Sequence, residues 1–452
     1  MSTQFSKRAL TAGLGAGALA LLAQTQRGSA DTPFTTFPFA ASGAPTPRTM
    51  PNRLADVVNA RDYGVAGDAS ADDTTALQNA INAAFGVNGN GTSWWLNRPL
   101  YIPAGRYKIS SALDLKNTKG GLIFGDGVDA TRIFNVTLGG TVLRVNGLAH
   151  GRIRDLYLHA QTGGKAMDFY WDGVQSISSQ MCQFENIVFE VTSGGVGCDV
   201  GTSGRDYQCD TSVWINCFFA TGGSGDGMRV YGQQALTHNL YGGQFLNNNI
   251  GLHVQMGSVT GVFGTFFVLS QDWDFLVSGS GCTSMMVAGC STESLKFGNI
   301  GIDATGATIS SCIQRNGNAG SVFLEVKGFA NVINCWSEAG VIRSGGADYA
   351  YLSVDNCKWG NPNAYPEWEG VFSPDIPLRS SAGSFTGKLV HYPLRARVFS
   401  ELPAAPYRGM TAVITGGHNL TTPTFGATVA AGRQNVPIQI WYNGAAWKVT
   451  GV

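Results

Sequence analysis

Two sets of residues in this chain could hydrolyse a glycosidic bond. Asp272 and Asp274 flank a tryptophan in "SQDWDF", and Glu293, Arg315 and Glu338 each stand three residues after a cysteine. Hydrolysis needs one carboxyl group as acid and a second as base or nucleophile, about 5 to 10 Å apart. If the cysteine-linked residues stack on successive strands, their two glutamates are ~9.6 Å apart, which suits an inverting hydrolase. A Glu–Arg–Glu ladder that only relieves like-charge repulsion is the alternative.

A second chemistry is suggested by strands in which apolar and polar residues alternate, as in "GMRVYG", "GLHVQM" and "FLEVKG". The predicted outward positions are Asp199, Arg229, Tyr231, His253, Leu276, Lys296, Glu325 and Lys327. An acidic polymer could lie along this strip, and elimination from a uronic acid would use a base and positive charge, here His253, Lys296 and Arg229. An ordinary solvated sheet face is the alternative.

The element that would position these residues is indicated by regularly spaced cysteines. Cys290, Cys312, Cys335 and Cys357 are 22, 23 and 22 residues apart. Upstream, the same register predicts Cys217, Gln244 and Phe266 at this position, after the turn residues Asn216, Gly243 and Thr265. A turn of about 22 residues holds three short strands, so the pattern predicts a parallel β-helix, with the thiols as small buried hydrophobes. A leucine-rich repeat has a similar period but needs a Leu-x-x-Leu-x-Leu signature, which the chain lacks.

The composition agrees with an all-β protein that binds no nucleic acid. Of 452 residues, 61 are Gly and only 13% are charged, which favours many turns and few solvated helices. Lys plus Arg equals Asp plus Glu at 30 each, so no net field attracts nucleic acid or an acidic membrane. Nine cysteines form no C-x-x-C pair, and we expect neither disulfides nor a metal site. The single Asp-x-Asp is a weak signal for calcium, and no cofactor is expected.

Residues 1–30 resemble an export signal. Lys7 and Arg8 precede an apolar run from Ala9 to Ala23, and a small-residue cleavage site follows at "GSA". The run is short for a membrane span, so we expect no stable membrane insertion once it is removed; a retained anchor is the alternative. The segment also resembles a twin-arginine export signal in which Lys7 replaces the first arginine. The mature protein is therefore expected to be secreted, periplasmic or on the cell surface.

The remaining chain divides into four predicted parts. Residues 31–57 form an extended arm, residues 58–370 the β-helix, residues 371–390 a linker, and residues 391–452 a small C-terminal β module. Asp72 or Asp73 is expected to cap a helix that covers the open end of the solenoid. In the C-terminal module, Trp441, Tyr442 and Trp447 could stack on sugars, although core packing is the commoner role.

Three segments between Val58 and Phe134 carry a family resemblance: "VNARDYGVAGDASADDTTALQNAINAA", "LYIPAGRYKISSALDL" and "GLIFGDGVDATRIF". They resemble the opening of the pectate-lyase-superfamily domain of rhamnogalacturonase and epimerase-like proteins and of phage tailspikes. The resemblance implies a right-handed parallel β-helix that binds or cleaves polysaccharide, and tailspike relatives suggest a homotrimer. No catalytic motif of this superfamily can be transferred residue by residue. The leading hypothesis is an exported hydrolase or lyase acting on an acidic or branched glycan; a non-catalytic carbohydrate-binding, adhesive or structural solenoid is the alternative.

Overall fold

The computed structural model shows a parallel β-helix, as the cysteine spacing predicted. Every strand pair between Val58 and Glu369 in the described residues is parallel. The structure describes residues 38–39, 45–86, 96–201, 207–278, 285–293, 300–302, 306–315, 322–326, 329–338, 341–344, 351–355, 358–359, 368–369, 397–398, 411–416, 419, 427–430 and 438–451.

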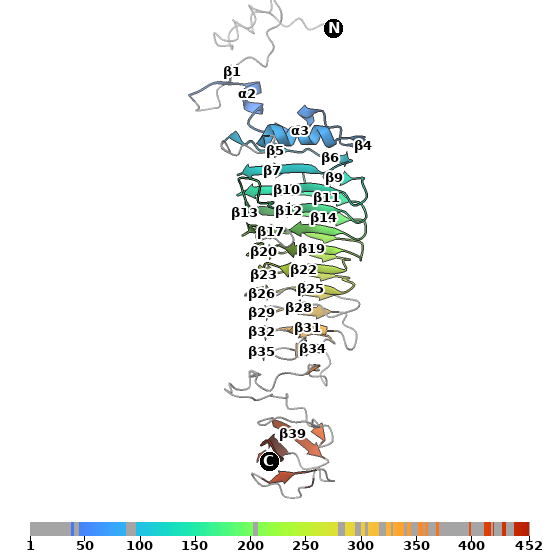
Figure 1. The fold of residues 1–452 in the computed structure, drawn as a ribbon, viewed down its shortest axis with the longest axis vertical. Coiled ribbons are helices and arrows are strands. Elements are labelled where there is room, and N and C mark those ends of the chain that lie inside the picture. The colour runs from blue at the N-terminus through green and yellow to red at the C-terminus, as the bar shows by residue number, and fades with distance from the viewer. Residues whose placement is uncertain are drawn as a thin grey trace, which may run out of the picture. The chain divides into compact units, whose positions relative to one another are not determined.

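One face of the solenoid is a sheet of 13 strands, here called sheet 1. In Figure 1 its strands β19, β22, β25, β28, β31 and β34 lie one below another. Its members are β7 (Leu113–Lys119), β10 (Thr141–Ala149), β12 (Lys165–Tyr170), β13 (Ser179–Gln180), β15 (Val196–Val200), β16 (Cys209–Asp210), β19 (Asp226–Tyr231), β22 (Ile250–Met256), β25 (Trp273–Val277), β28 (Ile300–Ile302), β31 (Val322–Val326), β34 (Val341–Ser344) and β37 (Trp368–Glu369).

A second series of strands, here called sheet 2a, follows sheet 1 in each coil and is visible as a separate column in Figure 1. It comprises β3 (Val58–Asn59), β5 (Leu100–Tyr101), β8 (Leu122–Phe124), the first parts of β11 (Arg152–Ala160) and β14 (Gln183–Val191), β17 (Val213–Ile215), β20 (His238–Tyr241), β23 (Val259–Phe263), β26 (Met285–Ala288), β29 (Ala307–Ser310), β32 (Phe329–Ile333) and β35 (Tyr351–Asp355).

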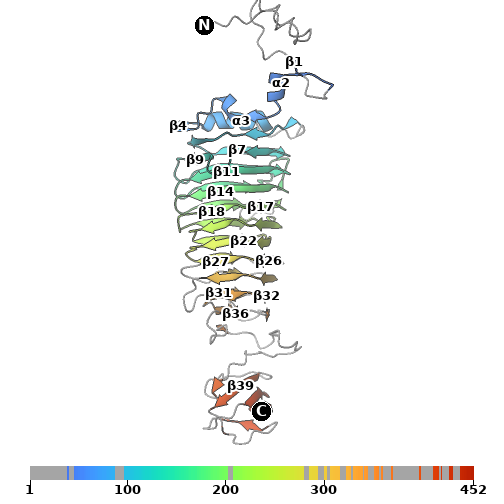
Figure 2. The ribbon, with the colours of Figure 1, turned by 180° about the vertical axis from the view of Figure 1, so that it is seen from behind.

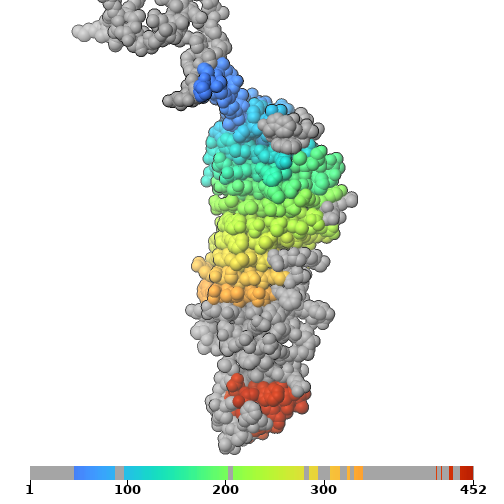
Figure 3. Space-filling model, turned by 90° about the vertical axis from the view of Figure 1, so that its left-hand side faces the viewer, coloured from blue at the N-terminus to red at the C-terminus, as the bar shows by residue number. Residues whose placement is uncertain are grey.

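The third series, sheet 2b, follows sheet 2a after a bend, and Figure 2 shows some of its strands from behind. The successive coils appear as colour bands in the space-filling view of Figure 3. Sheet 2b comprises β4 (Asp68–Asp72), β6 (Gly105–Ile109), β9 (Thr131–Asn135), the second parts of β11 and β14, β18 (Phe218–Ala220), β21 (Gln244–Leu246), β24 (Phe266–Val268), β27 (Ser291–Glu293), β30 (Ile313–Arg315), β33 (Trp336–Ser337) and β36 (Lys358–Trp359).

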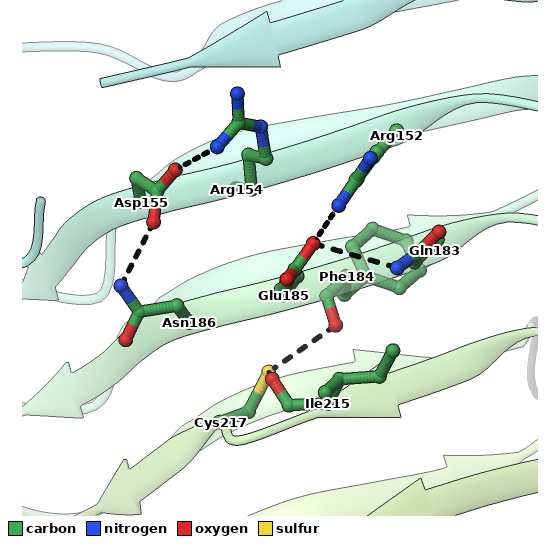
Figure 4. Close-up of polar contacts among 9 residues, drawn as sticks. All are labelled: Arg152, Arg154, Asp155, Gln183, Phe184, Glu185, Asn186, Ile215 and Cys217. Atoms are coloured by element: carbon green, nitrogen blue, oxygen red, sulfur yellow. Dashed lines mark hydrogen bonds and ion pairs between the residues drawn. The ribbon is translucent and has the colours of Figure 1, made fainter. Parts of the chain in front are cut away.

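The bend between sheets 2a and 2b is made by residues in the left-handed conformation. Asn216, Ser311 and Asn334 have φ of 49°, 53° and 54°, and amide or small side chains tolerate this region best. Farther up the solenoid, Asp155 accepts a 2.8 Å hydrogen bond from Nδ2 of Asn186 on the neighbouring strand (Figure 4). A side-chain hydrogen bond between coils therefore ties these two turns together.

The predicted register is wrong by one residue in two coils. Phe218 pairs with Gln244, and Gln244 pairs with Phe266, so Gly243 and Thr265 stand above one another in the column that begins at Cys217. The sequence placed Gln244 and Phe266 there. The error arose because neither coil has a cysteine to mark the column, and their strands start one residue earlier than was assumed.

Replacing Asn216 tests the energetic role of this bend. Its side chain is exposed and its φ is +49°, so Asn216→Ala should lower the free energy of unfolding by about 1 kcal/mol through backbone strain. Asn216→Gly is the matched control and should cost less than Ala, because glycine adopts positive φ without strain. Urea denaturation of the two variants measures the difference; equal stabilities would show that the left-handed turn is not what constrains this position.

The cysteines behave as core residues. All seven that the structure describes are buried and form no disulfide, and Cys290, Cys312 and Cys335 follow one another in register. Figure 4 shows Cys217 directed at the carbonyl of Phe184, with an Sγ–O distance of 3.6 Å. Burial raises the pKa of the Cys217 thiol to about 12. The hypothesis that these thiols fill the interior is confirmed for the described coils, whereas Cys357 lies outside the described residues.

The predicted helix is α3 (Thr74–Phe85), which follows the short 3-10 helix η2 (Ala60–Tyr63). Leu77, Ile81 and Phe85 are buried, and Gln78 exchanges 2.8 and 2.9 Å hydrogen bonds with the backbone of Asp114 in β7. The helix therefore lies against the first coils of the solenoid, above β7 in Figure 1.

The two aspartates at the start of this helix accept hydrogen bonds from different parts of the backbone. Asp73 occupies the N-cap position, but its carboxylate accepts from the backbone N–H groups of Ala66 and Gly67 at 2.6 and 3.0 Å. The N–H of Thr74 instead donates to Asp72 at 3.0 Å. Asp72 therefore provides the cap bond, and Asp73 fixes the preceding loop.

The two ends of the chain hold separate small elements. Near the N-terminus, β1 (Pro38–Phe39) pairs antiparallel with β2 (Arg48–Thr49), which α2 (Met50–Leu54) follows. Near the C-terminus, β38 (Arg397–Val398), β39 (Thr411–Gly416), β40 (Thr428–Val429), β41 (Ile438–Tyr442) and β42 (Trp447–Gly451) form a five-stranded sheet. Trp447 is 6% exposed in its core and contacts Tyr442, which favours core packing over a sugar platform.

The predicted export signal, residues 1–30, and the predicted linker, residues 371–390, lie outside the described residues. Within the described part of the chain, no helix is both long and apolar enough to span a bilayer.

Candidate active site

The predicted carboxylate ladder is aligned in the structure. Glu293 pairs with Arg315 between β27 and β30, and Glu338 follows Ser337, which pairs with Gln314. Glu338 and Arg315 are exposed, and Glu293 is half-buried. The three side chains therefore stand in one column on the outer face of sheet 2b, and their catalytic role stays a prediction.

The Asp272 and Asp274 pair does not form an open acid–base site. Asp274 is 0% exposed, whereas Asp272 is half-buried and its N–H donates to the carbonyl of Asn249. The chain turns into sheet 1 at this point, and the preceding coils carry Gly227 and Gly251 at the position of Asp274. The expectation that both carboxylates face a groove is wrong because the corner turns Asp274 inward. The pair is also a poor calcium site for the same reason.

The predicted strip on sheet 1 is correct in register as far as Leu276. Asp199 pairs with Arg229, Arg229 with His253, and His253 with Leu276. The next residue in the column is Gly301, followed by Glu325, so Gly301 stands at the position predicted for Lys296. Lys296 and Lys327 lie outside the described residues. A bulge after Val230 pairs Tyr231 with Met256.

The strip is an ion-pair network. Asp199, 4% exposed, accepts 2.9 and 2.7 Å bonds from Arg229 and lies 2.7 Å from the ammonium of Lys165. His253, 7% exposed, is 2.9 Å from Asp226 and 3.0 Å from the hydroxyl of Ser278. These hydrogen-bonding groups already satisfy one another. A substrate carboxylate would have to break those bonds to reach Arg229, so the strip is a weaker candidate site than the sequence suggested.

A pocket of about 400 Å³ opens instead on the outer face of sheet 2b, near the N-terminal end of the solenoid. Inward-facing Ile133, Leu158 and Phe189 are buried and fix the strands beneath it. Alternation along these strands then turns the neighbouring polar side chains outward. The pocket is lined by Arg106, Arg132, Ile133, Phe134, Val136, Tyr157, His159, Gln161 and Glu190.

Two register columns build the pocket. Arg106 pairs with Arg132 and Arg132 with Tyr157, so these three side chains stand on consecutive coils. In the adjacent column, His159 pairs with Glu190. Because the register is fixed by the strand ladders, these five side chains from four strands converge without any contribution from a loop.

The contacts within the pocket link an acid, a base and a cation. The hydroxyl of Tyr157 donates to Oε2 of Glu190, and the guanidinium of Arg132 lies 4.0 Å from the centre of the Tyr157 ring. Nε2 of His159 is 3.0 Å from the hydroxyl of Thr192. Arg106 lies over the Phe134 ring at 5.9 Å.

Burial sets the protonation states of Tyr157 and His159. The pKa of Tyr157 is raised well above its usual value, first by burial and then by its hydrogen bond to Glu190. The pKa of His159 is lowered, mainly because burial disfavours the imidazolium and secondarily because Arg132 repels it, although Glu190 opposes the shift. At neutral pH the pocket therefore contains a protonated phenol and an imidazole biased towards its neutral, basic form.

The two arginines give the pocket its charge. Among the described residues, no carboxylate forms a salt bridge with Arg106 or Arg132. Their backbones are one strand spacing apart, ~4.8 Å, so their like charges repel. A bound anion would relieve this repulsion and could accept bonds from both guanidinium groups.

The sequence contained a usable signal for this pocket. "RDLYLHA" places Tyr157 and His159 two residues apart on an alternating strand, and "FEVT" adds Glu190. The signal was missed because these coils contain no spaced cysteine. Steps of 26, 25 and 31 residues separate Arg106, Arg132, Tyr157 and Val188 along the register.

Glu190→Gln tests the contact between Glu190 and Tyr157. Removing the negative charge should lower the pKa of Tyr157 towards its usual value, but burial should keep it above that value. An ultraviolet pH titration measures this, with Tyr157→Phe identifying the signal. Glu185→Gln is the matched control, because Glu185 pairs with Arg152 on the same sheet (Figure 4) and should leave Tyr157 unchanged. Identical titrations of Glu190→Gln and wild type would contradict the assignment.

Within the described residues, no group of three His, Cys, Asp or Glu side chains is placed to hold a metal ion.

Residues 57–262, which include the whole pocket, match the sequence model of a family described as rhamnogalacturonase A/epimerase, pectate lyase-like. The mannuronan C5-epimerase AlgE3 of Azotobacter vinelandii is 37% identical over 91 residues, which are 20% of this chain and 4% of that protein. The mannuronan C5-epimerase AlgE5 of the same organism is 44% identical over 52 residues, or 12% of this chain and 4% of that protein. The matches therefore span only a small part of these relatives.

Among solved structures, the enzymatically active domain of tailspike protein 2 from bacteriophage CBA120 is similar, with a TM-score of 0.52. The alignment covers 85% of this chain and 59% of that domain at 12% identity, so it shows the fold alone. The strand register and this comparison show a parallel β-helix, and residues 57–262 of it are similar to the pectate-lyase-like family.

Proposed function

We propose that this protein is an exported enzyme that acts on a polysaccharide containing uronic acid. The observation that carries the proposal is the pair of adjacent arginines, Arg106 and Arg132, which lie next to Tyr157 and His159 and have no carboxylate partner among the described residues. Two guanidinium groups can bind a uronate carboxylate and neutralise it. The mannuronan C5-epimerases are similar to short segments of this chain, and their name states that they act on a uronic-acid polymer.

The proposed reaction is elimination. Neutral His159 removes the proton from the carbon next to the carboxylate, and the arginines stabilise the anion that develops on that carboxylate. The electron pair of the broken C–H bond forms a carbon–carbon double bond as the glycosidic C–O bond breaks. Protonated Tyr157 gives its proton to the leaving oxygen, which replaces Glu190 as the acceptor of the phenol's hydrogen bond. Hydrolysis is less well supported because Glu190 is the single carboxylate among the described lining residues.

Epimerisation is the second candidate function. It starts with the same proton abstraction but returns a proton to the opposite face of the carbon and leaves the chain intact. The sequence identity to short segments of mannuronan C5-epimerases favours epimerisation. Export and a secreted or surface location belong to this proposal, because the polymer would be encountered outside the cytoplasm.

The test is turnover of polymannuronate, polygalacturonate and an uncharged glucan in D2O. Unsaturated uronate and new chain ends would support elimination, and deuterium next to the carboxylate without cleavage would support epimerisation. Cleavage without unsaturation, or turnover of the uncharged glucan alone, would contradict uronate chemistry. Retention of polymer without product would indicate a binding protein.

A further inference from the structure

Three polar side chains on consecutive coils of sheet 1 form a chain of hydrogen bonds. Asp226 begins β19, His253 lies in the middle of β22, and Ser278 directly follows β25. Oδ2 of Asp226 is 2.9 Å from Nδ1 of His253, and Nε2 of the same ring is 3.0 Å from Oγ of Ser278. Carboxylate, imidazole and hydroxyl thus stand in the order of a Ser–His–Asp triad, which is recognised by geometry and not by sequence position.

The carboxylate fixes the position of the proton on the imidazole. Because a carboxylate can only accept hydrogen bonds, Nδ1 of neutral His253 carries the proton and donates it to Asp226. Nε2 then directs its lone pair at Ser278, whose hydroxyl donates to it. This is the tautomer in which a histidine can take the proton of a serine as general base.

The exposure of the three groups suits a nucleophile, a base and an orienting carboxylate. Ser278 is exposed, whereas His253 is 7% exposed and Asp226 is half-buried. Among the salt bridges of the described residues, Asp226 is paired with His253, and the neighbouring Arg229 is paired with Asp199. The hydroxyl can therefore meet a substrate while the imidazole and its carboxylate are held in place.

The neighbours of Ser278 offer the other parts of an acyl-transfer site. The N–H of Ser278 donates to the carbonyl of Val254 at 3.0 Å, so the parallel ladder continues and places Gln255 beside the serine. The amide nitrogen of Gln255 is 3.4 Å from Nδ1 of His253. Amide N–H groups can stabilise the oxyanion of a tetrahedral intermediate. Leu276, which pairs with His253 and is half-buried, provides an apolar surface for a small acyl group.

We propose that Asp226, His253 and Ser278 form a catalytic triad that hydrolyses O-acyl esters carried by a polysaccharide. Oγ of Ser278 attacks the ester carbonyl carbon while Nε2 of His253 takes the hydroxyl proton, and the carbonyl electron pair moves to the oxygen. When this pair returns, the bond to the sugar oxygen breaks and that oxygen takes the proton from His253. Water then gives a proton to His253 and its oxygen to the acyl carbon. The free acid leaves as Ser278 regains its proton.

An ester of a sugar hydroxyl suits the position of the triad. Ser278 is exposed on the outer side of sheet 1, so a bulky polymer can approach it and only the small acyl substituent has to reach Oγ. The choice of a polysaccharide as the acyl carrier rests on the proposed function, whereas the triad itself does not.

The test is acetate release by the full chain from O-acetylated polymannuronate and from an O-acetylated glucan. Ser278→Ala should abolish release. Asp226 acts through His253 as a positioning residue, so Asp226→Asn should lower kcat by about 10⁴-fold with little change in KM. Ser70→Ala is the matched control, because it removes the hydroxyl of an exposed serine in β4 and should keep the full rate. A fluorophosphonate should label Ser278 covalently, as mass spectrometry can locate.

Circular dichroism must show that the variants keep their β structure. No acetate release from either polymer by wild type would overturn the proposal, as would a Ser278→Ala variant with the wild-type rate. Unsaturated uronate and deuterium incorporation are measured in the same reactions. Their absence together with acetate release would contradict the chemistry of the pocket and support the triad, so the two proposals can fail separately.

Discussion

His159→Gln is expected to lower the turnover number on a polyuronate by about 10²- to 10⁴-fold, the usual contribution of a general base. Glutamine retains the size and a polar end for Thr192, so the loss reports the missing base. Substrate binding should change little, because Arg106 and Arg132 remain in place. Steady-state kinetics therefore should show a reduced kcat with a nearly unchanged KM.

The matched control is His150→Asn, which removes an exposed imidazole outside the pocket at a position with φ of 55° that asparagine tolerates. It should keep full activity. The wild-type pH profile provides a second check. Because the pKa of His159 is lowered, wild-type activity should persist below pH 6.5 and fall only as the imidazole becomes protonated. A His159→Gln variant with wild-type kcat would exclude His159 as the base.

Asp274→Asn is expected to stabilise the protein at pH 8 and to leave its activity unchanged. Burial raises the pKa of Asp274 to about 7, against 3.8 for the ordinary side chain, although a hydrogen bond from Ser270 opposes the shift. The folded protein thus holds a proton that the unfolded chain has released, and the free energy of unfolding falls as pH rises from about 4 to 7. The difference between the two pKa values corresponds to a loss of at most about 4 kcal/mol in the free energy of unfolding.

Asparagine has the same shape and no charge, so the variant should avoid this loss at pH 8 and differ little from wild type at pH 4. Urea denaturation at both values measures the effect. Buried His238, whose pKa is lowered to about 4, makes the free energy of unfolding rise with pH in both proteins. The effect of Asp274 is therefore read from the difference between the variant and wild type. Asp272→Asn is the matched control on a half-buried side chain. Equal stability of Asp274→Asn and wild type at pH 8 would contradict a buried, partly charged Asp274.

The fold could be predicted from the sequence because the solenoid repeats one physical requirement in each coil. Cys290, Cys312 and Cys335 mark a buried column, and Asn216, Ser311 and Asn334 mark the left-handed turn before it. Residues that must be small or must adopt positive φ are few in type. Their spacing therefore reveals the coil length even without an alignment.

The site was harder to predict because outward side chains are not restricted in this way. Asp199, Arg229 and His253 were assigned correctly to one column, yet their partners, Lys165 and Asp226, come from neighbouring positions that alternation alone does not connect. The pocket escaped notice because its column runs through coils of unequal length. Convergence of side chains across coils depends on register, and register was marked only where cysteines occur.

The most direct test of the proposed chemistry is a crystal structure of the protein with a bound uronate oligosaccharide. We predict that a sugar carboxylate will lie within hydrogen-bonding distance of the guanidinium groups of Arg106 and Arg132, with the adjacent carbon facing His159. An oligosaccharide bound instead along the Asp199–Arg229–His253 column, or beside Glu293 and Glu338, would contradict the assignment of the pocket as the active site.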